Sequence, residues 1–128
     1  MRNNFDISNI ESLVAAEVRK LGLTNVWNNR PKAIDEATSD FVVVKVAGGI
    51  FDKEAYGHCR VVLYLYARDV KEKKNSTKLS VMQTKLKTLP LWIEPLLLTG
   101  NPRIVGDTAD DFGFHVRIIN YKAFIKSK

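Results

Sequence analysis

The residues HCRVVLYLYAR, from His58 to Arg68, alternate in the way of a β-strand that uses both of its faces. One face of this extended strand carries small and aliphatic side chains, namely Cys59, Val61, Leu63, Leu65 and Ala67. The other face carries His58, Arg60, Val62, Tyr64, Tyr66 and Arg68. This second set is too aromatic for open water and too basic for a core. The same spacing recurs near the C-terminus in HVRIINY, which contains His115, Arg117, Ile119 and Tyr121. The pattern predicts a sheet with one core face and one face that needs a partner.

Length and composition predict a single domain over residues 1–128. A chain of this size can bury about two-thirds of its unfolded surface around one core. The hydrophobic share of 45% and the charged share of 27% are close to the globular average, which argues against a disordered or fibrous chain. The apolar runs are too short to cross a bilayer, and the first residues lack the profile of a secretion signal. We therefore expect a cytoplasmic protein.

Two amphipathic segments predict helices. Ser8 and Glu11 form a capping box before a stripe that ends at Gly22. This stripe contains Ile10, Leu13, Val14, Val18 and Leu21. Ser76 or Thr77 is expected to cap a second helix that ends at Pro90. Its apolar stripe contains Leu79, Met82, Leu86 and Leu89.

The remaining apolar segments predict strands. TNVW predicts a short strand. FVVVKV predicts a strand over residues 41–46, which a glycine pair at 48–49 ends. This strand is expected to be an antiparallel neighbour of the long strand 58–68. After Pro90, turn signals at 100–102 and 106–111 predict two short strands and one long strand over about 112–125. The fold class is α+β, with a mostly antiparallel sheet of four to six strands and two helices packed on one face.

Two helices cannot cover both faces of such a sheet. The predicted core between sheet and helices contains Leu63, Leu65, Val116, Ile118, Leu13, Val18, Leu79, Met82 and Leu86. The opposite face would form a subunit or partner interface, because tyrosine and arginine are favoured there. This interface set contains Arg60, Tyr64, Tyr66, Arg117 and Tyr121. The alternative is an amphipathic face that is merely solvated.

The lysine-rich connector DVKEKKNSTK predicts a solvated loop, and a flexible partner loop is the functional alternative. Its lysines are Lys71, Lys73, Lys74 and Lys78. Few apolar residues anchor this segment, so we expect it to be mobile.

Motifs for catalysis, metal ions or cofactors are absent from the sequence, so we expect no enzyme, no metal and no cofactor. Cys59 is the only cysteine and is predicted to be a buried thiol. The acidic residues Asp107, Asp110 and Asp111 lack the spacing of a calcium loop and instead indicate a turn. No hydroxyl nucleophile can be paired with a base from the sequence.

Nucleic-acid binding is the alternative function that the charge allows, since 20 Lys and Arg against 14 Asp and Glu give +6. The segment DDFGFHVRI looks like the aromatic strand of an RNA-recognition module. Acidic residues stand where that module has positive charge, and this chain begins with a helix instead of a strand. The alternative is therefore a basic α+β nucleic-acid-binding domain of another kind.

The order of elements resembles the tail terminator or tail-completion proteins of long-tailed bacteriophages. The resemblance spans about residues 8–125: an N-terminal helix, a Pro-containing loop before DFVVVKV, a strand ending LYLYAR, a polar connector, a second helix and terminal strands. It implies a phage or prophage virion-assembly protein without a cofactor. Such proteins form a ring, typically a hexamer, that caps the tail tube and joins it to the head connector. Another small phage neck protein, such as a head-completion protein, is similar in the same features.

Overall fold

The structure, a computed structural model, describes residues 7–29, 31, 34–47, 56–94, 96–99, 102–110 and 113–126. Its elements follow in the order α1 (Ile7–Lys20), β1 (Val26–Trp27), β2 (Asp40–Ala47), β3 (Tyr56–Arg68), α2 (Ser76–Lys85), the 3₁₀ turn η1 (Leu86–Thr88), β4 (Trp92–Ile93), β5 (Leu96–Leu98), β6 (Arg103–Asp110) and β7 (Phe114–Lys126). The α+β class predicted from the sequence is confirmed. The predicted glycine break at 48–49 lies outside the described residues.

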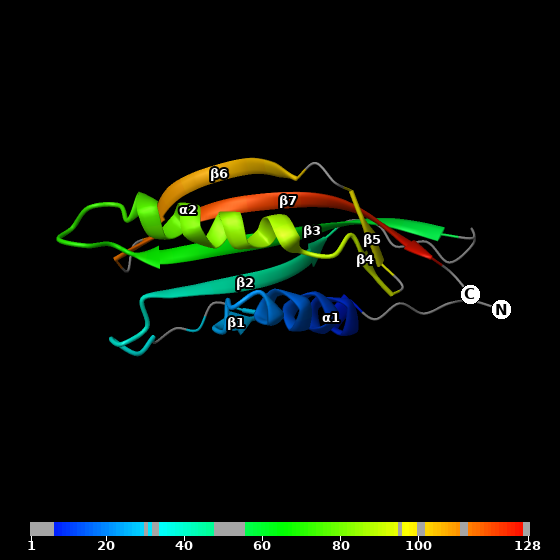
Figure 1. The fold of residues 1–128 in the computed structure, drawn as a ribbon, viewed down its shortest axis with the longest axis horizontal. Helices are drawn as coiled ribbons and strands as arrows, with labels where there is room; N and C mark the ends of the chain where they lie inside the picture. Colours follow the sequence, from blue (N-terminus) through cyan, green and yellow to red (C-terminus); the bar gives the residue numbers. More distant parts are fainter. Residues whose placement is uncertain are drawn as a thin grey trace.

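The sheet differs from the prediction in strand number and shape. Seven strands form one sheet in the order β1-β2-β3-β7-β5-β4, and β6 also pairs with β7. The β1/β2 pair is parallel and the other pairs are antiparallel, so the sheet is mixed. It curls into a half-barrel, so the predicted mostly antiparallel sheet of four to six strands with two helices packed on one face is corrected to a mixed, curled sheet. Figure 1 shows α1 alongside β2 and α2 across the long strands β3 and β7.

Strand β6 is longer than predicted, because only its first residues, between the predicted turns at 100–102 and 106–111, were expected to form a short strand. Residues 106–110 were predicted to be a turn, but they pair with β7 after a bulge between Ile104 and Gly106. A glycine fits at this bulge because a Cβ on Gly106 would lie 3.1 Å from Ile118 Cδ1. Asp111 and the residues 100–101 of the other predicted turn lie outside the described residues.

Helix α1 packs by Ile10, Val14 and Val18, all of which are buried. The predicted burial of Leu13 is wrong, since its side chain is 40% exposed. The predicted capping box is also wrong, because the helix already begins at Ile7. The Glu11 carboxylate instead accepts a 2.8 Å hydrogen bond from the Val46 backbone N–H. The predicted end of the helix is confirmed by Gly22, whose φ is +94°.

The cap of helix α2 lies one residue before the predicted cap. The Asn75 side chain accepts a hydrogen bond from the Lys78 N–H, so neither Ser76 nor Thr77 is the cap. The predicted apolar stripe is confirmed, because Leu79, Met82, Leu86 and Leu89 are all buried. The helix tightens into η1 before Pro90, whose ring cannot continue it.

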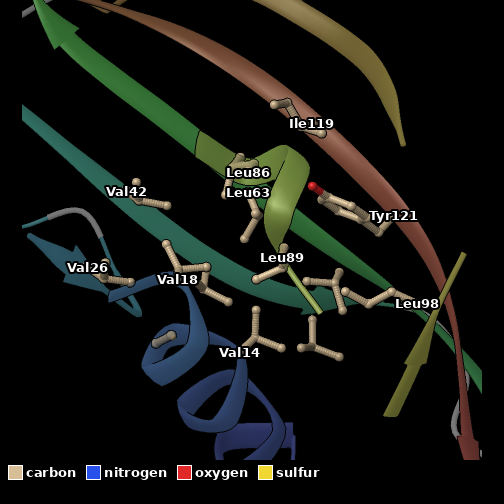
Figure 2. Close-up of a cluster of buried hydrophobic side chains, with 14 of the residues drawn as sticks. Val14, Val18, Val26, Val42, Leu63, Leu86, Leu89, Leu98, Ile119 and Tyr121 are labelled. Carbon is tan, nitrogen blue, oxygen red and sulfur yellow. The ribbon is translucent and has the colours of Figure 1, made fainter. Parts of the chain in front are cut away.

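The main core fills the curl of the sheet and includes side chains from both helices and from strands β1–β5 and β7 (Figure 2). Leu63 and Leu65 lie in it as predicted, each with no exposed surface. Their partners on β7 are Ile119 and Arg117, so Val116 and Ile118 lie on the opposite face. Val116 is buried there and Ile118 is partly buried. The predicted placement of these two residues against the helices is wrong.

Candidate functional site

The predicted interface set does not share one face. Arg60, Tyr64 and Tyr66 lie on the face of β3 that points away from the helices, called here the outer face. In the antiparallel register Tyr121 pairs with Val61 and Arg117 pairs with Leu65, and both of these β3 residues lie in the core. Residues directly opposite each other share a face, so Arg117 and Tyr121 lie on the helix side.

Tyr121 is a core residue with 4% of its surface exposed. Burial raises the pKa of its phenol to about 12, so the side chain stays neutral at physiological pH. Figure 2 shows its ring lying near Ile119 and Leu86. Tyr121 is therefore unavailable to a partner.

One end of the outer face is covered by the chain itself. Phe41, Val43 and Phe114 form a second buried cluster, against which Trp27, Ile34, Tyr64 and Tyr66 pack. The Tyr66 ring stacks on Phe41 with centroids 4.3 Å apart. Arg68 lies 4.4 Å from the Phe114 ring centre and donates hydrogen bonds to the carbonyls of Asp35 and Thr38. This part of the face is internal packing and leaves little room for a partner.

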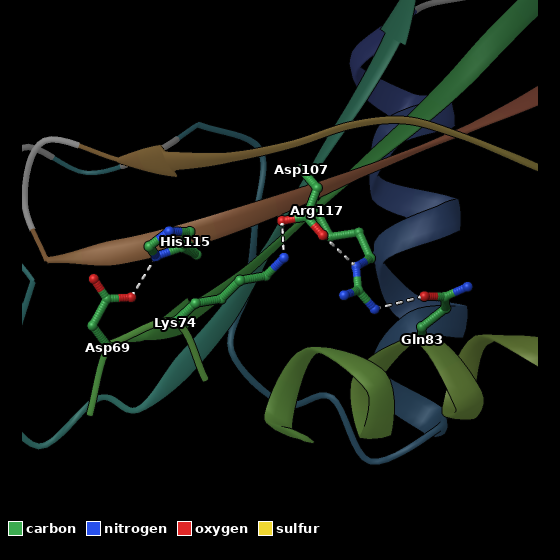
Figure 3. A network of polar contacts seen from close by, with 6 residues as sticks. All are labelled: Asp69, Lys74, Gln83, Asp107, His115 and Arg117. Carbon is green, nitrogen blue, oxygen red and sulfur yellow. Dashed lines mark hydrogen bonds and ion pairs between the residues drawn. The ribbon is translucent and has the colours of Figure 1, made fainter. Parts of the chain in front are cut away.

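Arg117 ties β6 and β7 to α2 (Figure 3). Its guanidinium donates to Asp107 Oδ2 at 3.1 Å and to Gln83 Oε1 at 2.9 Å, and its side chain is 13% exposed. Lys74 Nζ lies 2.8 Å from Asp107 Oδ1. Burial alone would raise the pKa of Asp107, but the hydrogen bonds and charges of Lys74 and Arg117 lower it below its usual 3.8. The network is structural and joins four segments.

His115 and Asp69 form a neighbouring pair, with Nδ1 and Oδ1 2.6 Å apart. A carboxylate in this position fixes the orientation of the ring, as it does in general-base pairs. The sequence analysis proposed no role for His115 beyond its strand position. Among the described residues no group of three His, Cys, Asp or Glu side chains is arranged to hold a metal ion. Cys59 is buried as predicted, and burial raises its pKa to about 11, which keeps it a thiol.

The lysine-rich connector is a tight hairpin and not an open loop. Val70 and Lys73 exchange two backbone hydrogen bonds of 2.9 and 3.0 Å around Lys71 and Glu72. Both central residues have positive φ, +52° and +64°, a conformation that usually favours glycine or asparagine. Two of the four predicted partner lysines are anchored, because Lys74 pairs with Asp107 and Lys78 lies 3.7 Å from Asp40.

The uncovered end of the outer face has a basic pair, of which Arg60 was in the predicted interface set and Lys122 was not. Arg60 on β3 stands directly opposite Lys122 on β7, and both are exposed. The next row toward the strand ends joins His58, Phe124, Leu97 and Trp92 across β3, β7, β5 and β4. The signal for Lys122 and Phe124 was the alternation of YKAFIK, in which Tyr121, Ala123 and Ile125 are the buried set.

Two edges of the sheet, beside β2 and beside β6, differ, and the short strand β4 forms a further edge. At the β2 edge, the Val42 N–H bonds to the Asn25 carbonyl at 2.8 Å and the Val46 N–H bonds to Glu11. At the β6 edge, all residues from 103 to 109 except Gly106 are exposed. No described strand pairs with the far side of β6, where Ile104 and Val105 are 54% and 55% exposed. A pocket of about 220 Å³ adjoins this edge and is lined by Gln83, Leu86, Lys87, Pro102, Ile104, Ile119 and Tyr121.

Comparison with known proteins identifies no relative. No protein-family model matches the chain, and no curated protein matches it either. Among the described residues, no helix has both the length and the apolar character needed to cross a membrane. The open β6 edge and the exposed part of the outer face are the two candidate functional surfaces among the described residues.

Proposed function

We propose that this protein is a structural virion-assembly protein of the tail-terminator kind, whose chains associate through the open edge of β6. The observation that carries the proposal is the contrast between the sealed β2 edge and the open, apolar β6 edge. An exposed edge strand presents unpaired backbone N–H and C=O groups, which a strand from another chain can satisfy. Ile104, Val105 and the adjoining pocket add apolar surface to that edge.

The sealed edge restricts how copies can join. Glu11 and Asn25 already occupy backbone groups of β2, so a β6 strand cannot extend the sheet of the next copy there. A β6 strand that pairs with another β6 gives a two-fold dimer, whereas a ring needs a second, different surface on the next copy. A terminator ring would use β6 for one contact, and its tail-tube and head-connector partners would bind elsewhere on the ring. A small neck protein of another kind would use the same edge.

A charged substitution on the edge tests this proposal. Val105 lies at the bulge and has no partner on β7, so Val105→Lys leaves the β6/β7 pairing in place. Lysine on an edge strand opposes pairing with another chain. Val70→Lys is the matched control, because Val70 is 54% exposed at the hairpin. Sedimentation velocity over a concentration series should show assembly by the wild type and by Val70→Lys, and its loss in Val105→Lys.

The opposite result is equally clear. A wild-type chain that sediments at the mass of one copy at every concentration argues against self-assembly. Equal assembly by Val105→Lys and Val70→Lys would show that β6 is a protected edge and not an interface. Thermal unfolding of both variants establishes that a loss of assembly is not a loss of folding.

A further inference from the structure

The exposed half of the outer face carries positive charge, and the described residues of its strand rows include no acidic side chain. Three successive rows across β2, β3, β7 and the strands beside β7 contain Lys45, Val62, Asn120 and Arg103, then Ala47, Arg60 and Lys122, then His58, Phe124, Leu97 and Trp92. None of these residues is acidic. Lys45 donates a hydrogen bond to the Asn29 amide oxygen. Arg60, Lys122 and Arg103 have no ion-pair partner among the described residues.

The pairing of Arg60 with Lys122 is unfavourable in the isolated protein. Like charges directly opposite each other on neighbouring strands destabilise a sheet. An anion placed between the two side chains would remove this repulsion and gain two charge-assisted hydrogen bonds. Arginine suits this role because its planar guanidinium matches the geometry of a phosphate. Charge complementarity thus selects an anionic occupant for this face.

The neighbouring aromatic row selects the kind of anion. Trp92 is 47% exposed, Leu97 43% and Phe124 37%, and they lie side by side on paired strands. Successive rows on one face of a sheet are separated by about 6.6 Å along the strands. Bases can therefore stack on the exposed part of the Trp92 ring, and on Phe124 beside its edge contact with His58, while the adjoining phosphates reach Arg60 and Lys122. Proteins that bind single strands without sequence preference combine a basic surface with aromatic rings in this way.

We infer that this half of the outer face, from Arg60 and Lys122 to Trp92 and Phe124, is a binding platform for single-stranded nucleic acid. Duplex fits less well, because its bases are already stacked and cannot use the rings. An anionic membrane also fits less well, because Trp92, Leu97 and Phe124 are each less than half exposed and offer little surface for insertion. The platform shares Arg103 with β6, but the Arg60/Lys122 pair and the aromatic row lie on β3, β7, β5 and β4 and do not depend on the proposed assembly.

Fluorescence anisotropy with a labelled oligothymidine tests the platform. An oligothymidine of about 20 nucleotides is long enough to fill one site. Three phosphate contacts from Arg60, Lys122 and Arg103 predict a salt slope near −2. Affinity should then fall about 20-fold between roughly 50 and 200 mM salt. The double variant Arg60→Glu/Lys122→Glu should bind at least about tenfold more weakly than the wild type, because two phosphate contacts are replaced by repulsion.

The control keeps the same net charge. Lys71→Glu/Lys73→Glu reverses two charges on the hairpin, so both double variants change the formal charge from +6 to +2, that is 6 − 4. The hairpin variant should bind like the wild type. Equal losses in the two variants would overturn the proposal, since only net charge would then matter.

Two further measurements separate stacking from charge. Trp92→Ala should weaken the single-strand complex several-fold and leave any weak duplex binding unchanged, because only single strands offer free bases. Duplex binding as tight as that of the oligothymidine would overturn the proposal. Binding to vesicles rich in phosphatidylserine, without binding to the oligothymidine, would overturn it in favour of a membrane surface. Sedimentation of the Arg60→Glu/Lys122→Glu variant should show unchanged assembly, so that failure of the platform is distinguishable from failure of the β6 interface.

Discussion

The pattern His-x-Arg occurs twice, as His58 to Arg60 on β3 and as His115 to Arg117 on β7. The two motifs lie on opposite faces of the sheet. Arg60, in the first motif, is exposed on the outer face opposite Lys122. Arg117, in the second, lies on the helix face with 13% of its side chain exposed and bonds to Asp107 and Gln83. Alternation within one strand shows which residues share a face. Only the register between strands shows whether two such sets point the same way, and a shift of one residue reverses the answer.

The strongest test of this register compares neighbouring faces of β3 and β7. Leu63→Ala should lower the free energy of unfolding by about 2–5 kcal/mol, because it opens a cavity in a fully buried site. Ile118→Ala should cost under about 2 kcal/mol, since the side chain is only partly buried on the outer face. Urea unfolding midpoints measure both. A larger cost for Ile118→Ala would place it in the main core and break the comparison.

The two arginines themselves give the second test. Arg117→Ala should cost about 1.5–3 kcal/mol, because Asp107 and Gln83 lose a charged donor at a mostly buried position. Arg60→Ala should change stability by less than about 0.5 kcal/mol, as is usual for an exposed side chain, and Arg60 has no ion-pair partner among the described residues. The same substitution in the two motifs makes each variant the control for the other. Equal effects in thermal unfolding would show that the Arg117 network contributes little.

Acid should weaken the ion pair that Arg117 of the second motif forms with Asp107. The pKa of Asp107 is lower in the folded state than its usual 3.8, so its contribution to stability is present above about pH 4. That contribution, about 1 kcal/mol, is lost as the pH falls through the folded pKa. Asp107→Asn should therefore destabilise at pH 7, and its difference from the wild type should shrink as the pH falls below 3.8 and through the lowered folded pKa. A constant difference between the two proteins over this range would contradict the ion-pair role.

Much of the fold follows from local patterns in the sequence. The 3.6-residue stripes of α1 and α2 and the period-two pattern of β3 identified these elements, because each buries a single side against the core. Strand β6 was predicted to end before Gly106, because Gly106, Asp107 and Asp110 are also typical of turns. Pairing with β7 overrides that local preference.

The error in the predicted site came from β7, which changes its apolar face along its length. Phe114, Val116 and Ile118 are apolar because the outer face at that end also carries the Phe41 cluster. Farther along, Ile119, Tyr121 and Ala123 belong to the main core. A single alternating pattern extended through this change places Arg117 and Tyr121 on the wrong side. The second cluster depends on long-range packing by Trp27, Ile34 and Phe41, which no local pattern in β7 reveals.

The last prediction has the smallest expected effect, and its informative result is whether the free energy of unfolding rises or falls. Arg60→Glu turns the repulsive pair with Lys122 into an attractive one, so it should raise the free energy of unfolding by about 0.2–1 kcal/mol. Lys122→Glu should do the same, and the double variant, which restores a like-charge pair, should return to the wild-type value. The gain should shrink as salt screens the pair. This cycle needs only thermal unfolding at two salt concentrations. If either single reversal destabilises the protein, Arg60 has a role in the fold that its exposed position does not explain. If both stabilise it while weakening oligonucleotide binding, the first motif retains an unfavourable charge that serves binding, whereas the second uses its arginine to hold β6, β7 and α2 together.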